Sequence, residues 1–220
     1  MEVNLIDKMG SDLSVVNAAR VSFAKISEWE TIPHAGPTEG ALKYEDERLI
    51  KYLAKHGHWT PFGHGSLQFH IKAPVFVARQ LVKHQVGLVW NEVSRRYVNS
   101  EPEFYTPEVW RGAPENKKQG SSDIKIDIDP DDFVRMYDSA KWMYEHLLEI
   151  GVCPEQARMV LPQSMMTEWY WSGTLYAFAR VCNLRCKDDA QFETQMVANQ
   201  IDELAEEIFP YSWEALRDGN

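Results

Sequence analysis

Positively charged side chains are concentrated in one short stretch of an acidic chain. Between residues 79 and 96 they are Arg79, Lys83, Arg95 and Arg96, and the single acid there is Glu92. The whole chain carries a formal net charge of -10. Several N–H donors aimed at one point favour the binding of phosphate or another anion. Pairing with acidic groups elsewhere on the surface is the alternative, and the charges alone leave both open.

Two further arginines lie in apolar surroundings. They are Arg158 in the segment ARMVLP and Arg185 in the segment CNLRC. Burying a guanidinium is costly unless it meets an anion or several carbonyl oxygens. A structural ion pair explains one such residue. Two of them, together with the pair Arg95–Arg96, favour ligand binding.

Ser94 carries the one hydroxyl between residues 79 and 96. A nucleophilic serine needs an adjacent general base, and the surrounding string NEVSRRY contains none that we recognise. No Gly-x-Ser-x-Gly elbow surrounds it either. A hydrogen bond from Ser94 to a phosphate is therefore the favoured role.

Three histidines, His56, His58 and His64, stand in the string HGHWTPFGH. Three imidazoles can form a catalytic zinc site. However, no carboxylate or thiolate stands beside them at a helical ligand spacing, and Thr60-Pro61-Phe62 forces a turn within the string. We expect a structural or ligand-facing histidine cluster and no metal.

The chain has three cysteines, Cys153, Cys182 and Cys186. This odd, small number excludes a disulfide framework and predicts a reducing compartment, the cytoplasm. Cys182 and Cys186 are four residues apart on one helical face, where buried thiols are the expected role and a redox or metal role is the alternative. Cys153 precedes a predicted helix start, which can stabilise a thiolate, but no histidine is near it in sequence.

Composition sets the class of protein. The chain has 220 residues, of which 44% are hydrophobic and 25% charged, as in a globular protein with a full core. Its acidity argues against a general nucleic-acid or anionic-membrane binder. No apolar run reaches the roughly 18 residues of a membrane span, and no secretory signal is readable at the start.

Hydrophobic spacing predicts the elements that position these residues. Predicted helices cover 13–24, 44–57, 74–84, 133–147, 173–183 and 192–208, and predicted strands cover 67–71 and 165–171. The string NEVSRRY is predicted as a turn or a short extended piece. Residues 99–130 lack periodicity and are rich in Pro, Gly and Ser, which predicts a loop or lid. Helices and few strands mixed along the chain predict one α/β or α+β domain over residues 1–220.

Three strings together resemble the flavin-dependent thymidylate synthases. They are AARVSF, HGHWTPFGH…FHIKAPVFVARQLVKH…WNEVSRRY and ARMVLP…TEWYWSGTLYAFARVCNLRCKDDAQFE. The matching positions run from about Ala18 to Pro210, and the Asn-Glu-x-Ser-x-Arg-Tyr string is specific.

The resemblance implies a fold, a reaction and an assembly. The fold is a small, mostly antiparallel sheet with flanking helices. The reaction is methylation of dUMP to dTMP with methylenetetrahydrofolate, in which FAD carries the redox step and NADPH supplies electrons. The assembly is a homotetramer whose active sites are shared between subunits, with no nucleic-acid or membrane partner.

The resemblance also assigns dUMP contacts to particular residues. The set that resembles dUMP-binding positions is Gln80, Glu92, Ser94, Arg95, Arg96, Arg158 and Arg185. Ser94 and the residues after it resemble the phosphate contacts, and Arg158 resembles the arginine that reaches dUMP from another subunit. Arg185 resembles the arginine beside the uracil, where it would stabilise negative charge that develops on the ring. Arg185 and Ser94 are thus the catalytic candidates, and Glu92 is expected to orient its neighbours.

A second set of residues resembles flavin contacts. It comprises Ser22, His58, Thr60, Lys83, His84, Gln85, Glu92, Thr174, Arg180 and Asp189. His58 resembles a position close to both the flavin ring and the folate.

Several of these positions depart from the family pattern. Lys83-His84-Gln85 stands where Arg-His-Arg is usual, the spacer to Ser94 is one residue longer, and Arg95 stands where glycine is common. Thr174, Arg180 and Asp189 replace Asn, Asn and His. Lysine lacks the bidentate fork of arginine, and Gln85 has no charge. We therefore expect altered phosphate contacts to the flavin, with Arg180 as a hypothetical replacement for the arginine missing at 85.

The sequence also allows two other functions. The departures at Lys83, Gln85 and Arg95 allow a catalytically silent flavin- or nucleotide-binding protein of the same fold. The histidine cluster allows a metal-dependent hydrolase. Bound flavin, bound metal and loss of the uracil 5-hydrogen distinguish the three.

Overall fold

Four antiparallel strands form the central sheet. The computed structural model describes residues 1–31, 40–115 and 120–217, and its sheet has the strand order β1-β4-β8-β5. The strands are β1 (Glu2–Met9), β4 (Ser66–Pro74), β8 (Met166–Thr174) and β5 (Leu88–Glu92). Each strand runs antiparallel to its neighbours. The expected α/β class with a small, mostly antiparallel sheet is confirmed.

Alternating side chains place one face of β4 in the core, as the sequence predicts. Leu67, Phe69 and Ile71 are buried, whereas the polar residues between them are partly exposed. Phe69 lies opposite Trp171 of β8, and Ile71 lies opposite Trp169. Because side chains on neighbouring strands that lie opposite share a face, this register collects an apolar, aromatic layer on one side of the sheet.

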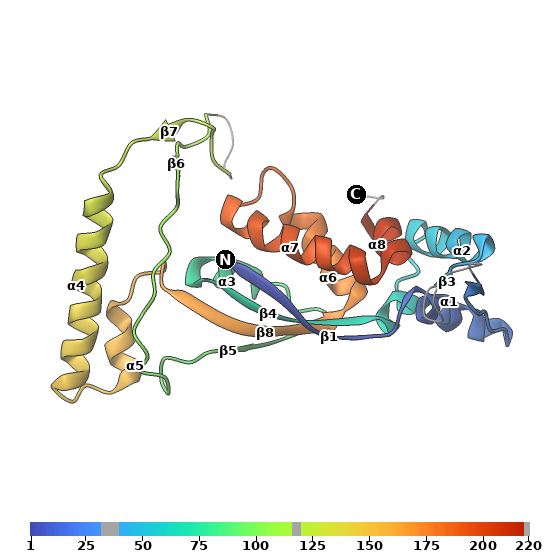
Figure 1. The fold of residues 1–220 in the computed structure, drawn as a ribbon, viewed down its shortest axis with the longest axis horizontal. Helices are drawn as coiled ribbons and strands as arrows, with labels where there is room; N and C mark the ends of the chain where they lie inside the picture. The colour runs from blue at the N-terminus through green and yellow to red at the C-terminus, as the bar shows by residue number, and fades with distance from the viewer. Residues whose placement is uncertain (32–39, 116–119, 218–220) are drawn as a thin grey trace.

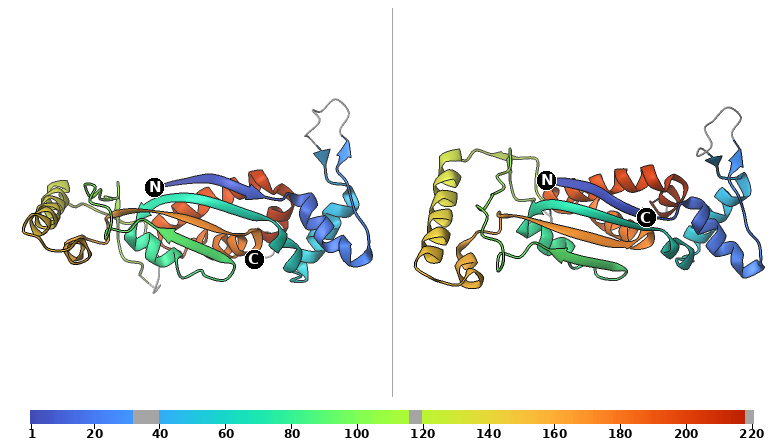
Figure 2. Two further views of the ribbon diagram at one scale, coloured as in Figure 1. Left: turned by 90° about the horizontal axis from the view of Figure 1, so that it is seen from below. Right: turned by 60° about the horizontal axis from the view of Figure 1, so that its bottom comes forward.

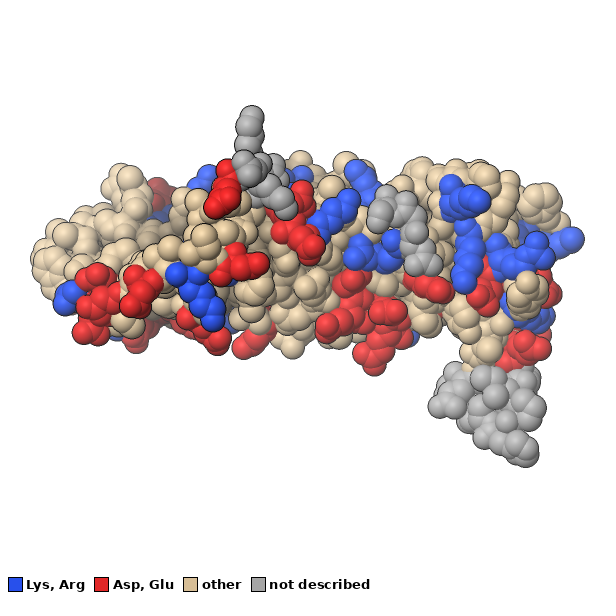
Figure 3. All heavy atoms as spheres, turned by 90° about the horizontal axis from the view of Figure 1, so that it is seen from above, with Lys and Arg blue, Asp and Glu red and all other residues tan. Residues whose placement is uncertain are grey.

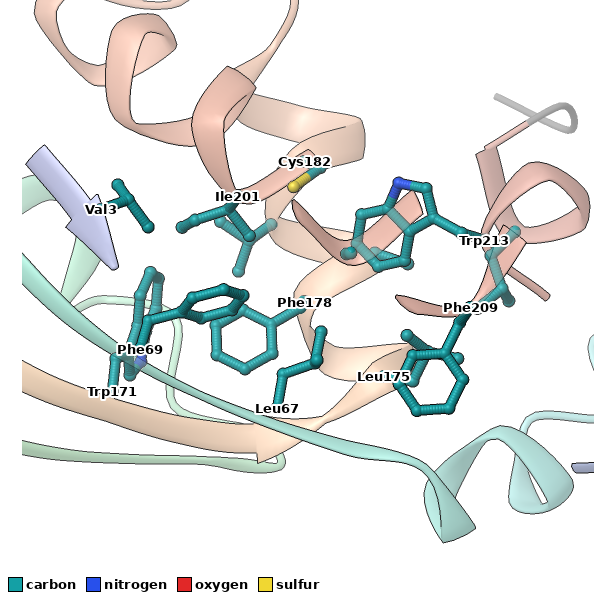
Figure 4. Close-up of a cluster of buried hydrophobic side chains, with 14 of the residues drawn as sticks. Val3, Leu67, Phe69, Trp171, Leu175, Phe178, Cys182, Ile201, Phe209 and Trp213 are labelled. Atoms are coloured by element: carbon teal, nitrogen blue, oxygen red, sulfur yellow. The ribbon is translucent and has the colours of Figure 1, made fainter. Parts of the chain in front are cut away.

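Helices cover that face of the sheet (Figure 1). The covering helices are α3 (Val75–Leu81), α6 (Leu175–Arg185) and α7 (Phe192–Ile208). Figure 4 shows Phe69 and Trp171 of the sheet pointing toward Phe178 of α6. The rings of Phe69 and Phe178 meet edge to face with centroids 5.0 Å apart, a preferred arrangement of aromatic pairs. α6, which carries Arg185, is therefore fixed on the sheet by its buried side.

The N-terminal helices form one end of the molecule (Figure 2). The elements there are α1 (Asp12–Arg20), η1 (Val21–Phe23), β2 (Glu30–Thr31), β3 (Gly40–Ala41), α2 (Tyr44–Lys55) and η2 (Thr60–His64). Ser11 and Ser14 form a reciprocal capping box at the start of α1, which supplies partners for N–H groups that lack one within the helix. The predicted helix from Tyr44 ends just before Gly57, whose φ of 68° suits the chain reversal.

A long helix stands away from the sheet at the opposite end (Figure 1). It is α4 (Pro130–Glu149), and the short α5 (Pro154–Ala157) and η3 (Arg158–Val160) follow it. The amphipathic helix predicted here is confirmed, but Tyr144 is the one side chain of α4 that is buried in the described chain. Trp142 is 60% exposed and Ile150 is 62% exposed, so an apolar surface remains on this arm.

Residues 99–115 and 120–129, the described parts of the segment predicted as a loop, lie beside α4 (Figure 1). They hold β6 (Trp110–Arg111) and β7 (Lys125–Ile126), which pair antiparallel. Phe104 stacks on Tyr137 at 4.7 Å, and Trp110 stacks on Phe133 at 4.3 Å between ring centroids. These pairs tie the segment to α4. A function as a lid stays a prediction.

Several elements differ from the sequence prediction, and three of these differences have a clear physical reason. The helix predicted over 74–84 ends at Leu81, because a turn follows in which Gly87 has a φ of 78°. β5 starts at Leu88, before the string NEVSRRY, and its last two residues, Asn91 and Glu92, agree with the short extended piece predicted as one alternative there. α8 (Pro210–Arg217) was not predicted, since a proline breaks the apolar pattern, although proline fits the first turn of a helix.

The start of α8 is held by a buried carboxylate from the start of α1. Asp12 is 2% exposed, and its side chain accepts hydrogen bonds from the backbone N–H groups of Tyr211 at 3.3 Å and Ser212 at 2.7 Å. These groups have no partner within α8, because the first N–H groups of a helix never do. No helix in the described residues is both long and apolar enough to cross a membrane.

We expect Asp12→Ala to destabilise the protein by about 2–3 kcal/mol, because two buried N–H groups lose their acceptor. Urea unfolding measures this change. Asp7→Ala serves as the control, since Asp7 is exposed and accepts only the N–H of the next residue. Equal midpoints for the two variants would contradict the role of Asp12.

Candidate active site

Arg185 at the end of α6 is oriented by a histidine. Its Nε donates a hydrogen bond to Nε2 of His84 at 2.9 Å. Burial first, and then the charges of Arg185 and Arg180, lower the pKa of His84 to about 4. His84 is therefore neutral near pH 7, with its proton on Nδ1 and its other nitrogen free to accept. A neutral acceptor fixes the guanidinium without cancelling its charge.

Two glycines hold the turn that carries His84 against the sheet. Gly87 has a φ of 78°, and its carbonyl accepts the N–H of Thr174 at 3.1 Å. A Cβ on Gly173 would lie 2.5 Å from the carbonyl oxygen of Gly87 and 2.4 Å from the side chain of Leu88. Only glycine at 173 allows this close approach. The contacts of these two glycines therefore fix the backbone of the spacer between Gln85 and Ser94, which is one residue longer than the family pattern.

A cavity of about 600 Å³ contains Gln80 and Arg185. Its other lining residues are Arg111, Gly120, Ser121, Asp189, Ala190, Gln191, Phe192 and Glu193. We call it the Arg185 cavity. Among the described residues, Gln80 Oε1 is buried and has no hydrogen-bond partner, an arrangement that is costly for a polar atom. The structure thus brings together Gln80, Arg185 and Asp189 from the predicted set.

A second cavity, of about 750 Å³, lies between α2, α6 and α8. Arg180 and Tyr176 of α6 line it together with Lys51, Lys55 and Lys187. We call it the basic cavity. The ring of Trp59 lies 6.1 Å from that of Tyr176, so η2, which begins at Thr60, borders this side of α6.

The loop after β5 carries Ser94, Arg95 and Arg96. Ser94 Oγ accepts the backbone N–H of Arg96 at 3.3 Å, and no base contacts this hydroxyl in the described chain. Arg95 donates to the carbonyls of Ser100 and Glu101 and lies 6.0 Å above the ring of Tyr144. Arg95 therefore organises its own loop in this chain, while Arg96 stays exposed.

The cations between 79 and 96 do not pair with acids within the described residues. No ion pair involves Arg79, Lys83, Arg95 or Arg96 there. The structure therefore does not support the alternative of surface pairing. Of these four, Arg79, Lys83 and Arg96 keep a positive charge available to an anionic ligand, whereas Arg95 is engaged by its own loop.

Glu92 is positioned on the sheet edge by two donors. Its carboxylate accepts from Thr167 Oγ1 at 2.8 Å and from Trp90 Nε1 at 3.3 Å. This geometry fits the orienting role expected for it. The same carboxylate is exposed.

Arg158 lies at the start of η3, beside α4, and is exposed. Within the described chain it lines neither cavity, and neither do Ser94 and Arg96. Figure 1 shows α5 and the chain after β5 at the α4 end, whereas α6 lies over the sheet. One copy of the chain therefore does not gather the arginines at 96, 158 and 185 in one cavity.

The expected flavin contacts fall at several places. Ser22, His58 and Thr60 are exposed near the α2 end, and Lys83 and Gln85 are exposed in the turn after α3. The His58 ring lies 6.0 Å from Tyr52 and 6.3 Å from His56. His64 is not in this group.

Thr174 caps α6. Its hydroxyl oxygen accepts the N–H of Ala177 at 3.2 Å, and its own N–H donates to the carbonyl of Gly87. Thr174 therefore has a structural role, and its flavin contact stays a prediction.

Two of the three cysteines, Cys182 and Cys186, form a small polar cluster with Asp202 of α7. Cys182, Cys186 and Asp202 have ligand atoms within 4.8 Å of one another. The carboxylate of Asp202 is already engaged by Trp213 Nε1 at 2.8 Å and Arg217 Nε at 2.8 Å, and burial raises the pKa of the Cys182 thiol. These contacts favour the expected structural role over metal binding.

Some residues that line the two cavities were not among the site residues predicted from the sequence. Arg111 pairs with buried Glu193 at 2.7 Å and lies 4.3 Å above the ring of Phe192. It comes from the aperiodic segment 99–130, where nothing signals which side chain folds back. Lys51 and Lys55 are four residues apart on a predicted helix, and that spacing was a usable signal.

The sequence matches the family described as "Thymidylate synthase complementing protein" over residues 4–211. The chain belongs to this family. The resemblance inferred from its motifs is thereby confirmed. Relatives in the family include proteins named flavin-dependent thymidylate synthase. The one from Thermus thermophilus is 38% identical over 98% of this chain and 75% of the relative. The one from Thermosipho africanus is 37% identical over 97% of this chain and 89% of the relative.

A solved structure of similar fold is the UMP/dUMP methylase PolB from Streptomyces cacaoi bound with 5-Br dUMP. The TM-score is 0.81 at 30% identity, over 99% of this chain and 94% of that chain. This family member thus shares its architecture with an enzyme crystallised with a pyrimidine nucleotide.

The contact between His84 and Arg185 predicts a pH-dependent stability. The ordinary pKa of histidine, 6.5, falls to about 4 in the folded protein. Between these values the unfolded chain binds a proton that the folded chain does not, so the free energy of unfolding falls as pH drops from 6.5 to 4. The slope is at most about 1.4 kcal/mol per pH unit.

His84→Gln should remove this part of the pH dependence, since Gln still accepts a hydrogen bond but does not titrate. Urea unfolding at several pH values measures it, with exposed His64→Gln as the control. Identical pH profiles for wild type and His84→Gln would refute the neutral histidine.

Proposed function

We propose that this chain is a flavin-dependent thymidylate synthase. It converts dUMP to dTMP with the methylene group of methylenetetrahydrofolate, using FAD and NADPH. The observation that carries the proposal is the Arg185 cavity, where a guanidinium fixed by neutral His84 lies with the unsatisfied Oε1 of Gln80. A pyrimidine nucleotide supplies the donor that Gln80 lacks and the developing negative charge that Arg185 stabilises.

Methylation at C5 of uracil places negative charge on the ring and its carbonyl oxygens during reaction. Electrostatic stabilisation by a preoriented donor is worth about 10²–10³ in rate. Arg185 is preoriented because its Nε is engaged by His84, which leaves its two NH₂ groups for the ligand. The proposed site uses no serine or cysteine nucleophile, because the folate would supply the methylene group and the bound flavin would supply the reducing equivalents.

The phosphate of the nucleotide needs separate donors. Ser94, Arg96 and Arg158 are accessible and supply a hydroxyl and two guanidinium groups. Phosphate recognition by arginine forks is strong and directional. Since these residues lie outside the Arg185 cavity of their own chain, a second copy has to supply them. This supports a homotetramer with shared sites.

The residues present also fit FAD. The basic cavity and the turn at 83–85 offer cations for its diphosphate, and Tyr176 and Trp59 offer aromatic surface. When bound, FAD supplies the redox chemistry of the reaction. The contribution of the chain is to place the flavin next to the nucleotide and to exclude water.

The proposed reaction predicts release of the hydrogen at C5 of uracil. Protein incubated with [5-³H]dUMP, FAD, NADPH and methylenetetrahydrofolate should release tritium to water and form dTMP. A yellow protein that never releases tritium would favour the catalytically silent flavin-binding alternative. A colourless protein that holds stoichiometric zinc would favour a hydrolase.

Arg185→Ala should lower the rate of dTMP formation by about 10²–10³ if Arg185 stabilises the developing charge. Arg96→Ala should also lower the rate of dTMP formation. If the site combines two subunits, co-expression of the two variants forms some sites with both arginines intact. The mixed protein should then form dTMP at least about tenfold faster than either single variant. This recovery is smaller than the loss in rate expected for each single variant.

The matched control is co-expression of Arg185→Ala with Gln80→Ala. These residues line one cavity of one chain, so no mixed site is intact and activity should stay low. Recovery in this control, or no recovery in the first mixture, would contradict the shared site.

A further inference from the structure

The end of α6 carries two thiols, which stand on either side of Arg185 in the sequence. Cys182 lies in the last turn of the helix, and Cys186 is its C-cap residue. Cys182 is fully buried, and its Sγ donates to the carbonyl of Ala198 at 3.6 Å. Figure 4 shows it close to Ile201 of α7. Cys186 is partly exposed, so one thiol of the pair is accessible to a small solute and the other is shielded.

The two sulfur atoms are within reach of one another. They lie within 4.8 Å of each other and of a carboxylate oxygen of Asp202. Cα atoms four residues apart in an α-helix are separated by about 6 Å, which is within the range that a disulfide accepts. Their Cβ atoms are about 5–6 Å apart, whereas a disulfide needs about 3.8 Å. A bridge between Cys182 and Cys186 therefore forms only if the last turn of α6 tightens.

The surroundings of Cys186 favour its thiolate. The largest influence on its pKa is a hydrogen bond from the Cys182 thiol, which lowers it. Burial and Asp202 raise this pKa, Arg217 lowers it, and the net change is downward. The negative charge of Asp202 is compensated, because Arg217 Nε pairs with it at 2.8 Å. A partly exposed thiolate beside a guanidinium is the reactive form of cysteine.

Hydrogen peroxide is an oxidant that suits this position. Figure 3 shows Lys and Arg side chains together toward the end of the molecule that carries α2, and acidic groups spread over the rest of this face. An uncharged oxidant is neither attracted nor repelled by such a surface. Its reaction depends on the exposure and the thiolate character of each cysteine. Both favour Cys186 over Cys182, whose pKa is raised by burial.

Closing the bridge changes the backbone around Arg185. This residue stands between the two thiols, in the turn that has to tighten. Its Nε donates to His84 at 2.9 Å, and that contact orients the guanidinium in the Arg185 cavity. A displacement of about 1 Å at an active site can cost about 10² in rate. Oxidation of the pair therefore acts on the group that the proposed reaction depends on.

We propose that Cys182 and Cys186 are an oxidation site, at which hydrogen peroxide closes a reversible disulfide that moves Arg185 away from His84. The Cys186 thiolate attacks one oxygen of the peroxide, the O–O bond breaks, and hydroxide leaves, so that Cys186 becomes a sulfenic acid. The Cys182 thiol then attacks the sulfenic sulfur and gives up its proton, and the sulfenic oxygen leaves as water. The two sulfur atoms together lose two electrons, which the peroxide gains. A dithiol reopens the bridge by thiol–disulfide exchange.

The chemistry of the pair is tested on the whole chain by peptide mass spectrometry after treatment with hydrogen peroxide. Cys182→Ala removes the thiol that closes the bridge, and Cys186→Ser removes the thiol that attacks the peroxide. Cys153→Ser is the matched control, because Cys153 is exposed and lies outside the pair. Circular dichroism and melting confirm that all variants are folded.

We expect wild type and Cys153→Ser to form a bridge between Cys182 and Cys186 that dithiothreitol reopens. Cys182→Ala should instead accumulate a sulfenic acid at Cys186, which dimedone traps. Cys186→Ser should form neither product. The proposal is overturned if the pair stays reduced while Cys153 is oxidised, or if Cys182→Ala gives no trapped sulfenic acid at Cys186.

The effect on Arg185 is measured separately by an NMR titration of His84, whose signals are assigned with His84→Gln. In the reduced protein the charge of Arg185 contributes to the lowered pKa of His84, about 4. This pKa should rise when the bridge closes and return when dithiothreitol opens it. A bridged protein whose His84 still titrates near 4 overturns the proposed movement of Arg185.

The consequence for activity rests on the proposed function. Peroxide should slow dTMP formation by wild type at least about tenfold, and dithiothreitol should restore it, whereas Cys186→Ser should stay within about twofold of its untreated rate. Equal losses in wild type and Cys186→Ser would contradict a role of the pair in this reaction. If reduced wild type forms no dTMP, the proposed function falls, and the bridge and the His84 titration alone decide this inference.

Discussion

The hydrogen bond from Arg185 to His84 is the interaction on which the candidate site depends. A guanidinium next to a cavity needs an acceptor that fixes its direction, and a carboxylate would neutralise it. A histidine whose pKa is lowered to about 4 provides orientation without negative charge. Burial of His84 therefore has a functional consequence, because the same packing that excludes its proton preserves the charge of Arg185.

The sheet and its glycines impose this contact. His84 and Arg185 are about a hundred residues apart, at |i−j| = 101, and they meet because α3 and α6 each follow a strand, β4 and β8, that pair with one another. The close approach of Gly87 to Gly173 then seats the turn against β8. Aromatic packing under α6 fixes the other partner. The site is thus a product of strand register and of local backbone freedom.

Much of the fold could be predicted from the sequence, because its signals are local. The alternation at Leu67, Phe69 and Ile71 and the spacing in α2, α4, α6 and α7 report burial directly. Most of β5 and all of α8 were not predicted, because their partners are distant in sequence: β5 pairs with β8, and α8 is capped by the carboxylate of Asp12. The motif strings gave the family and its candidate residues.

The site itself was less predictable, because side chains meet through tertiary structure. Nothing in the sequence shows that Arg111 folds back to Glu193, or that Lys187 faces Lys55. In one copy of the described chain, Arg96 and Arg158 do not line the cavity that contains Arg185, so a common site for the three arginines depends on the proposed assembly.

A crystal structure of the protein with dUMP and FAD tests the central claim most directly. The nucleotide should lie in the Arg185 cavity, within hydrogen-bond distance of Arg185 and Gln80, with its phosphate on Arg96 and Arg158 of another copy. A nucleotide bound elsewhere, or an Arg185 side chain turned away from the pyrimidine, would contradict it.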